Sequence, residues 1–303
     1  MSQDFSPRYG VATELALGIR RIVAQNPSPM TFTGTNTYLV GDRDIAVIDP
    51  GPDDEMHLHA ILDALTAKQS ISHIFVTHSH LDHAPLARPL AERTGAPILA
   101  FGDAEAGRSD IMRKLFADGN VGGGEGVDQS FVPDQTVVDG QIVSGADWQL
   151  EVLHTPGHLG NHICLAWNEV CFTADHVMGW ASSLISPPDG DLTDFMTSCH
   201  RMKSRNWHRF YPGHGDVVEN PIERLDWLIS HRQVREAAIL DVLARQPANI
   251  PALTVAVYKD IPEKMLPAAQ RNVLAHLIDL FGKSRVRPIR DFTVEAVFEL
   301  RGF

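Results

Sequence analysis

The sequence is poor in cysteine and has no apolar run long enough to span a membrane. Its three cysteines, Cys164, Cys171 and Cys199, form no C-x-x-C pair, and this small odd number argues against a disulfide framework. The N-terminus, MSQDFSPRYG, lacks the basic segment followed by an apolar stretch that marks an export signal. We therefore expect no association with a membrane and a reducing, cytoplasmic location.

Positive charge is also scarce. The sequence has 26 Lys and Arg residues against 38 Asp and Glu residues, which gives a formal net charge of −12. Such a surface repels polyanions on average, so binding to nucleic acid would need a local basic patch. Hydrophobic residues make up 44% of the sequence, an ordinary globular share, and 303 residues suit one large domain and a smaller one.

The first part of the chain predicts a run of strands followed by alternating helices and strands. Short apolar runs separated by turn residues between 18 and 50 favour antiparallel strands, and 56–68 has the pattern of an amphipathic helix. Residues 71–77 are typical of a buried strand. Further strand patterns lie at 97–102, 141–145, 148–154, 161–167, 170–174 and 209–213, and further helix patterns at 85–94 and 191–204. Glycines make 118–130 a predicted mobile loop, of the kind that often covers active sites.

The C-terminal part predicts a separate small domain. Residues 220–245 have the pattern of a long amphipathic helix, and Pro247 and Pro251 mark its end. We therefore divide the chain into domains 1–245 and 246–303. Helix, helix and hairpin patterns follow at 252–258, 267–281 and 285–300. This order is typical of a winged helix.

The strongest chemical signal is the segment THSHLDH at 77–83, directly after a predicted strand. Side chains two residues apart in an extended chain face the same way, so His78 and His80 can bind one ion. Asp82 and His83 follow where the chain turns into a helix, and they can face a second ion. A lone histidine is ordinarily a surface or hydrogen-bonded core residue, but four ligand-type side chains so close together are hard to explain by packing.

Three more candidate ligands end other predicted strands. His158 and His214 each follow a strand and a Pro-Gly turn, and Asp175 closes the strand 170–174, where its carboxylate could bridge two metals. Loops can gather such strand ends on one rim of a sheet. Nitrogen and carboxylate ligands without thiolate suit Zn²⁺ and also Fe or Mn. We expect two divalent metal ions, with zinc favoured.

The motifs H-x-H-x-D-H, TPGH, the strand-end Asp175 and PGHG occur in an order that resembles the metallo-β-lactamase superfamily. The resemblance implies an α/β (α+β) fold, an αββα sandwich, here followed by the small winged-helix domain. It also implies one set of ligands for each metal. These are His78, His80 and His158 for the first metal and Asp82, His83 and His214 for the second, with Asp175 between them.

A narrower likeness concerns the segments TPGHLGNHICLAW and PAAQRNVLAHL. They resemble the subgroup that carries a C-terminal winged helix, which includes a single-strand endoribonuclease. The resemblance disfavours β-lactam hydrolysis, because the commonest lactamases have a cysteine at the position of Asp175.

The expected chemistry is metal-assisted hydrolysis. Two metals about 3.5–4 Å apart can share a water and make it a hydroxide near neutral pH, so no serine or cysteine nucleophile is needed. Asp82 is the candidate catalytic residue, which would orient that hydroxide and later take up a proton.

Three residues beside the candidate ligands have open roles. Asp49 is a candidate to hold an imidazole tautomer, or else a turn-capping residue. His162 and His176 are candidates for contact with substrate or for a structural role. His57 and His59 have the pattern of helix-surface residues.

Two functions remain open from the sequence. The first is hydrolysis of a small-molecule ester, thioester or lactone, and the alternative is a single-strand-specific endoribonuclease that cleaves RNA. A basic cluster for RNA would come from Arg201, Lys203, Arg205 and Arg209. The predicted recognition helix offers only Arg271 and His276, which is poor material for reading bases. We therefore expect the winged helix to wall the active-site cleft or to join a homodimer.

Overall fold

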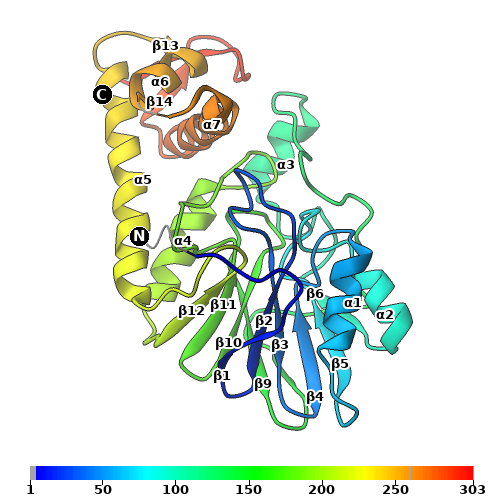
Figure 1. Ribbon diagram of the computed structural model, residues 1–303. Helices are drawn as coiled ribbons and strands as arrows, with labels where there is room; N and C mark the ends of the chain where they lie inside the picture. Colours follow the sequence, from blue (N-terminus) through cyan, green and yellow to red (C-terminus); the bar gives the residue numbers. More distant parts are fainter. Residues whose placement is uncertain (1–4, 260, 303) are drawn as a thin grey trace.

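Two β-sheets stacked face to face form the centre of the molecule, and helices cover both outer faces (Figure 1). This computed structural model describes residues 5–259 and 261–302. The long helix α5 (Pro221–Leu243) runs along one side of the sandwich and leads into a small C-terminal domain over one end of the sheets. The helix–sheet–sheet–helix layering is therefore as the sequence predicts.

The first sheet has seven strands in sequence order. Strands β1 to β4 pair antiparallel, and β4 to β7 pair parallel. The strands are β1 (Thr13–Ala16), β2 (Ile19–Val23), β3 (Asn36–Val40), β4 (Asp44–Ile48), β5 (Ser70–Phe75), β6 (Ile98–Ala100) and β7 (Gln135–Thr136). Helices α1 (Glu55–Asp63) and α2 (Ala87–Thr94) cover its outer face.

The second sheet has five strands in the order β12-β11-β10-β9-β8. Only β11 and β12 pair parallel. The strands are β8 (Ile142–Ser144), β9 (Gln149–His154), β10 (Ile163–Trp167), β11 (Val170–Ala174) and β12 (Arg209–Pro212). Helices α4 (Leu192–Lys203) and α5 cover its outer face.

The central strands β3, β4, β10 and β11 are buried along nearly their whole length, because both faces of each sheet are covered there. In β4, Ile45 and Val47 pack under the outer helices, whereas Ala46 and Ile48 point into the core between the sheets. Successive side chains of a strand face opposite ways, so one apolar run serves two cores.

The C-terminal domain has its own core, which includes the end of α5. Its elements are β13 (Ala248–Asn249), α6 (Ile250–Val257), the 3₁₀ turn η1 (Glu263–Met265), α7 (Leu266–Gly282), β14 (Val286–Pro288) and β15 (Val297–Leu300). Strand β15 lies between β13 and β14. Helix α3 (Asp110–Ala117) of the sandwich packs into the same core, so the two parts share apolar surface. No helix in the described part of the chain is both long and apolar enough to cross a membrane.

The prediction that His57 lies on a helix surface is wrong. Its side chain is only 2% exposed, and its Nε2 lies 2.8 Å from Thr37 Oγ1. The reason is that His57, Leu58 and Ile61 share the face of α1 that packs on the first sheet. His59 is exposed, as expected. The helix also ends at Asp63, earlier than predicted.

The carboxyl ends of the parallel strands meet at one edge of the sandwich. Asp49 and the segment 77–83 follow β4 and β5 of the first sheet, and Asp175 and His214 follow β11 and β12 of the second. The main chain links the sheets there, because Asn36 N donates to the Gly213 carbonyl at 2.7 Å. This edge therefore brings together chain segments that are far apart in sequence.

Gly157 provides a test of how tightly this edge packs. Its φ is +143°, and a Cβ would lie 2.4 Å from Phe195 Cα and 2.6 Å from the Phe195 backbone nitrogen. We expect Gly157→Ala to lower the free energy of unfolding by about 3 kcal/mol, from backbone strain and overpacking together. The control is Gly95→Ala at φ +75°, where nothing lies within 4 Å of the new Cβ and only about 1 kcal/mol is expected. Urea unfolding measures both, and equal losses would contradict the packing argument.

Candidate metal centre

All seven predicted ligand side chains come together at the sandwich edge. They form two groups, each small enough to surround one ion. The first group is His78, His80, His158 and Asp175, and the second contains Asp82, His83 and His214. The ligand atoms within each group lie within 4.8 Å of one another.

The first group is compact. His80 Nδ1 lies 3.0 Å from His78 Nε2 and 3.0 Å from His158 Nε2, and His158 Nε2 lies 3.5 Å from Asp175 Oδ2. Four ligands placed tetrahedrally at about 2.0–2.1 Å from one Zn²⁺ are separated by about 3.3–3.4 Å. The spacing of these atoms therefore fits a single small cation.

The second group has the same spacing. His214 Nε2 lies 3.3 Å from His83 Nε2 and 3.2 Å from Asp82 Oδ2. Asp175 Oδ1 lies 3.3 Å from His214 Nε2 and 3.5 Å from His83 Nε2. Asp175 thus offers one carboxylate oxygen to each group, and Oδ1 has no hydrogen-bond partner although it is buried. This is the arrangement expected of a bridging carboxylate.

The hydrogen bonds behind the imidazoles fix which nitrogen is free to bind a cation. His158 Nδ1 lies 2.7 Å from the Leu184 carbonyl oxygen, which can only accept, so Nδ1 carries the proton. Thr77 Oγ1 lies 2.8 Å from Asp49 Oδ2 and 2.9 Å from His78 Nδ1. The hydroxyl donates to the carboxylate and therefore accepts from His78.

With their ring protons on Nδ1, His78 and His158 direct free Nε2 lone pairs into the first group, as ligands of a metal would. The Nε2 atoms of His78 and His158 both present lone pairs toward His80 Nδ1, which has at most one proton to donate. The three nitrogens therefore cannot satisfy one another by hydrogen bonds alone. A cation between them would satisfy all three.

Asp49 connects the two groups. Its Oδ2 accepts from His83 Nδ1 at 2.8 Å and from the Thr77 hydroxyl, and its Oδ1 accepts from Thr77 N at 2.8 Å. His57 supports it from behind, because Thr37 Oγ1 donates to the Asp49 carbonyl at 2.6 Å and receives the proton of His57 Nε2. The sequence offered Asp49 as a candidate for this position and missed His57.

The electrostatic environments of the two groups differ. Burial and the neighbouring His158 lower the pKa of His80 to about 3, so this imidazole is neutral and available as a ligand. Burial also lowers the pKa of His83, but the carboxylates of Asp82, Asp175 and Asp49 outweigh it and raise the value to about 9. The second group thus has excess negative charge, which attracts a cation.

Two non-glycine residues beside the centre have left-handed backbones. Asp49 has φ of 51° and Ala174 has φ of 40°, each at the end of a strand. Such conformations cost about 1–3 kcal/mol each and persist where surrounding contacts enforce them. Both turn the chain so that Asp49 and Asp175 reach the ligand groups.

His162 and His176 do not contact the open side of the centre. Both side chains are fully buried. His162 Nδ1 bonds Thr155 Oγ1 at 2.9 Å, and His176 Nε2 lies 3.6 Å from Cys199 Sγ. Of the two roles that the sequence left open, burial behind the centre favours the structural one.

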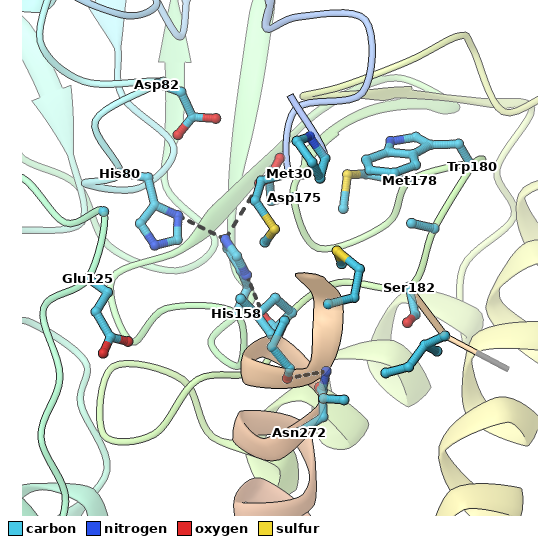
Figure 2. A pocket seen from close by; sticks show the side chains of 18 of the residues that line it. Met30, His80, Asp82, Glu125, His158, Asp175, Met178, Trp180, Ser182 and Asn272 are labelled. Atoms are coloured by element: carbon cyan, nitrogen blue, oxygen red, sulfur yellow. Dashed lines mark hydrogen bonds and ion pairs between the residues drawn. The ribbon is translucent and has the colours of Figure 1, made fainter. Parts of the chain in front are cut away.

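A cavity of about 350 Å³ opens over both groups. His80, Asp82, His158 and Asp175 form its polar floor, as Figure 2 shows. Its walls are mostly apolar and come from three distant parts of the chain. They include Pro29, Met30, Met178, Trp180, Leu184, Tyr258, Ile261, Met265, Ala268 and Ala269. No sequence motif marks these residues, because only the tertiary fold brings them together.

The segment 118–130 closes another side of the cavity through Glu125 and Gly126. Arg271 of α7 holds it, with Nη2 2.8 Å from Glu125 Oε2 and 2.8 Å from the Gly122 carbonyl oxygen. Gly124 N also donates to Asp189 Oδ2 at 2.6 Å. This segment is therefore attached to α7 in the structure.

A sequence profile described as the metallo-beta-lactamase superfamily matches residues 30–225, which contain every residue of the two groups. The chain belongs to the metallo-β-lactamase superfamily. A second profile, the beta-lactamase associated winged helix domain, matches residues 250–291. The predicted fold, a superfamily sandwich followed by a winged helix, is confirmed, and the chain is a metal-dependent hydrolase of this superfamily.

The sequence aligns with named relatives over most of their length. The chain is 32% identical to a beta-lactamase-like protein 2 homolog of Drosophila melanogaster over 289 residues, covering 91% of each chain. A homolog of the same name from Caenorhabditis elegans is 31% identical, with 86% of this chain and 83% of the relative covered. The crystal structure of a beta-lactamase domain protein from Burkholderia ambifaria superposes with a TM-score of 0.81 at 20% identity, covering 98% of this chain and 96% of that one.

The Asp49 network leads to a prediction about metal affinity in this superfamily member. Asp49→Asn replaces one acceptor oxygen by an NH2 group, so the side chain can no longer accept all three hydrogen bonds from His83 Nδ1, Thr77 Oγ1 and Thr77 N. We expect metal affinity to fall about 10–100-fold, the usual effect of losing such a supporting group. Competition with a chromogenic chelator measures it. Asp63→Asn, at an exposed position of α1, is the control, and an unchanged affinity in Asp49→Asn would contradict the role of Asp49.

Proposed function

We propose that the protein is a dinuclear hydrolase of small-molecule esters, thioesters or lactones. His78, His80 and His158 would hold one divalent metal, Asp82, His83 and His214 the other, and Asp175 both. The observation that carries the proposal is the mostly apolar wall of the cavity over this floor, which has no lysine or arginine in its lining among the described residues. An adjoining cavity that shares His80 and His158 has one arginine, Arg271, which is paired with Glu125. Zn²⁺ suits the donor set best, and Fe or Mn would also fit.

Two bound cations would lower the pKa of a shared water toward neutrality and polarise a carbonyl oxygen. Asp82 has one side exposed to the cavity and the other against His214. Burial raises the pKa of Asp82, but His83 and His214 more than offset it and hold the pKa below the ordinary value. Asp82 is therefore ionised at neutral pH and can accept a hydrogen bond from a water beside it.

The position of the basic residues argues against RNA as the substrate. None of the four residues Arg201, Lys203, Arg205 and Arg209 lines the cavity, and Arg209 begins strand β12 at the end opposite to the one that His214 follows. All four side chains are also paired with acids. The pairs are Arg201 with Asp139, Lys203 with Asp226, Arg205 with Glu151 and Arg209 with Glu219. A phosphate backbone gains little from charges that are already neutralised.

Helix α7 is also poorly suited to bind nucleic acid. His276 is only 1% exposed, and Arg271 is bound to Glu125 and Gly122. Its residues Ala268, Ala269 and Asn272 instead line the cavity. The expected role of the winged helix as a wall of the cleft agrees with this placement.

His80→Ala tests the hydrolase proposal. Loss of one nitrogen from the first group should lower kcat on p-nitrophenyl esters or acyl thioesters by on the order of 100-fold or more, because the metals supply the nucleophile and stabilise the developing charge. Metal content should fall with it. His59→Ala, on the exposed face of α1, should keep wild-type activity. Full activity in metal-loaded His80→Ala protein would refute the proposed centre.

The ionic strength of the assay separates the two substrate classes. We expect kcat/KM on an uncharged ester to change less than about twofold between 50 and 200 mM salt. A protein that contacts six to ten phosphates would lose roughly a thousandfold or more in affinity over that range. Cleavage of unstructured RNA that weakens this steeply, with no ester turnover, would replace the proposal by the ribonuclease alternative.

A further inference from the structure

One amide side chain interrupts the mostly apolar wall that the C-terminal domain contributes to the cavity, where the other polar side-chain group among the lining residues is the Tyr258 hydroxyl. Asn272 of α7 lines the cavity beside Met265, Ala268 and Ala269. Figure 2 shows it on the helix, on the far side of His158 from Asp82. An isolated amide in an apolar wall commonly fixes the orientation of a ligand, since its neighbours supply only dispersion contacts.

The orientation of this amide is determined by its partners. Asn272 Oδ1 lies 2.9 Å from Arg232 Nη1 and 3.3 Å from Ile185 N, and both of these groups can only donate. Arg232 is 2% exposed, and its other Nη atom donates to the Ser183 carbonyl oxygen. The oxygen of Asn272 is therefore fixed toward Arg232, and the Nδ2 group faces the other way.

One Nδ2 hydrogen of Asn272 has a partner, and the other is available. Nδ2 lies 3.2 Å from the Ala268 carbonyl oxygen, one turn earlier in α7. An amide nitrogen carries two hydrogens, so one donor remains for the cavity that Asn272 lines. Because a buried arginine holds the amide in place, binding a ligand would cost little further ordering.

We propose that Asn272 is a specificity-determining residue that donates a hydrogen bond to a non-reacting oxygen of the substrate. The inference rests on the proposed ester or thioester hydrolysis. It narrows the substrate to acyl compounds with an apolar chain and a second carbonyl oxygen at a set distance from the scissile one. The methionines Met30, Met178 and Met265 would contact the chain, since unbranched thioethers adapt to irregular apolar shapes.

A second role for Asn272 must be separated from this one. Ile185 N donates to Asn272, and the neighbouring Leu184 carbonyl accepts from the metal-ligand candidate His158. Loss of Asn272 could therefore act through His158 alone. Such an effect would reduce turnover of every substrate by the same factor, whereas a lost hydrogen bond to substrate changes only the preference between substrates.

The test compares p-nitrophenyl octanoate with keto analogues in which a carbonyl is moved one carbon at a time along the chain. The wild-type protein loaded with metal should prefer one analogue over the plain ester by about fivefold to tenfold, through a lower KM at similar kcat. Asn272→Asp keeps an acceptor for Arg232 and Ile185 N but has no amide hydrogen. In this variant the ratio of kcat/KM between that analogue and the plain ester should fall to about one.

The control is Gln246→Glu, an amide-to-acid change at an exposed position, which should keep the wild-type ratio. The inference is overturned if the wild-type protein shows no keto preference, or if Asn272→Asp retains it. It is also overturned if Asn272→Asp loses metal and turns over all esters more slowly in equal proportion. Turnover of the plain ester without any preference would leave the hydrolase proposal intact, whereas no turnover of any ester would remove both.

Discussion

The structure depends on one electrostatic constraint, the convergence of lone pairs from five imidazoles and two carboxylates on two small volumes. Asp175 lies between these volumes with one oxygen toward each, and its buried Oδ1 has no hydrogen-bond partner among the residues that the structure describes. Burying such groups without positive charge would be costly. In the first group the hydrogen bonds of His78 and His158 hold their ring protons on the side away from the centre, so these two imidazoles do not relieve the cost.

The fold meets this constraint with rigid elements. Two parallel strand pairs, one in each sheet, end at the same edge and deliver Asp49, the segment 77–83, Asp175 and His214 to it. The left-handed backbones of Asp49 and Ala174 are tolerated because packed strands hold both sides of each turn. Asp49 Oδ2 then accepts hydrogen bonds from both His83 and Thr77, so one carboxylate oxygen connects the two groups.

The sequence predicts which candidate ligand side chains lie together, because their signal is local. Alternation in an extended chain places His78 and His80 together, and strand ends with Pro-Gly turns mark His158 and His214. For His162 and His176 the sequence alone leaves contact with substrate and a structural role open, because both lie near candidate ligands in sequence. The structure buries both, which favours the structural role.

The cavity wall could not be predicted because it depends on contacts across the whole chain. Met30 comes from a loop within the region predicted to form strands, Trp180 from a loop after β11, and Met265 from the C-terminal domain. None of them has a periodicity or motif that distinguishes it from an ordinary apolar residue. The burial of His57 could be predicted only in part. Its spacing from Ile61 indicates the buried face of α1, whereas histidine as a residue type is more often found at the surface.

The C-terminal domain connects the cavity wall to the candidate metal centre. Its helix α7 lines the cavity, attaches the segment 118–130 through Arg271 and receives the buried Arg232 of α5 through Asn272. Arg232 also donates to the Ser183 carbonyl, in the same loop as the Leu184 carbonyl that orients His158. The buried Arg232 guanidinium therefore contacts both Asn272, in the cavity wall that would select the substrate, and the loop 183–184, which orients the candidate ligand His158. Winged helices often bind nucleic acid through one helix, but here the residues of α7 make these internal contacts instead. This favours a role of the domain in shaping the cavity.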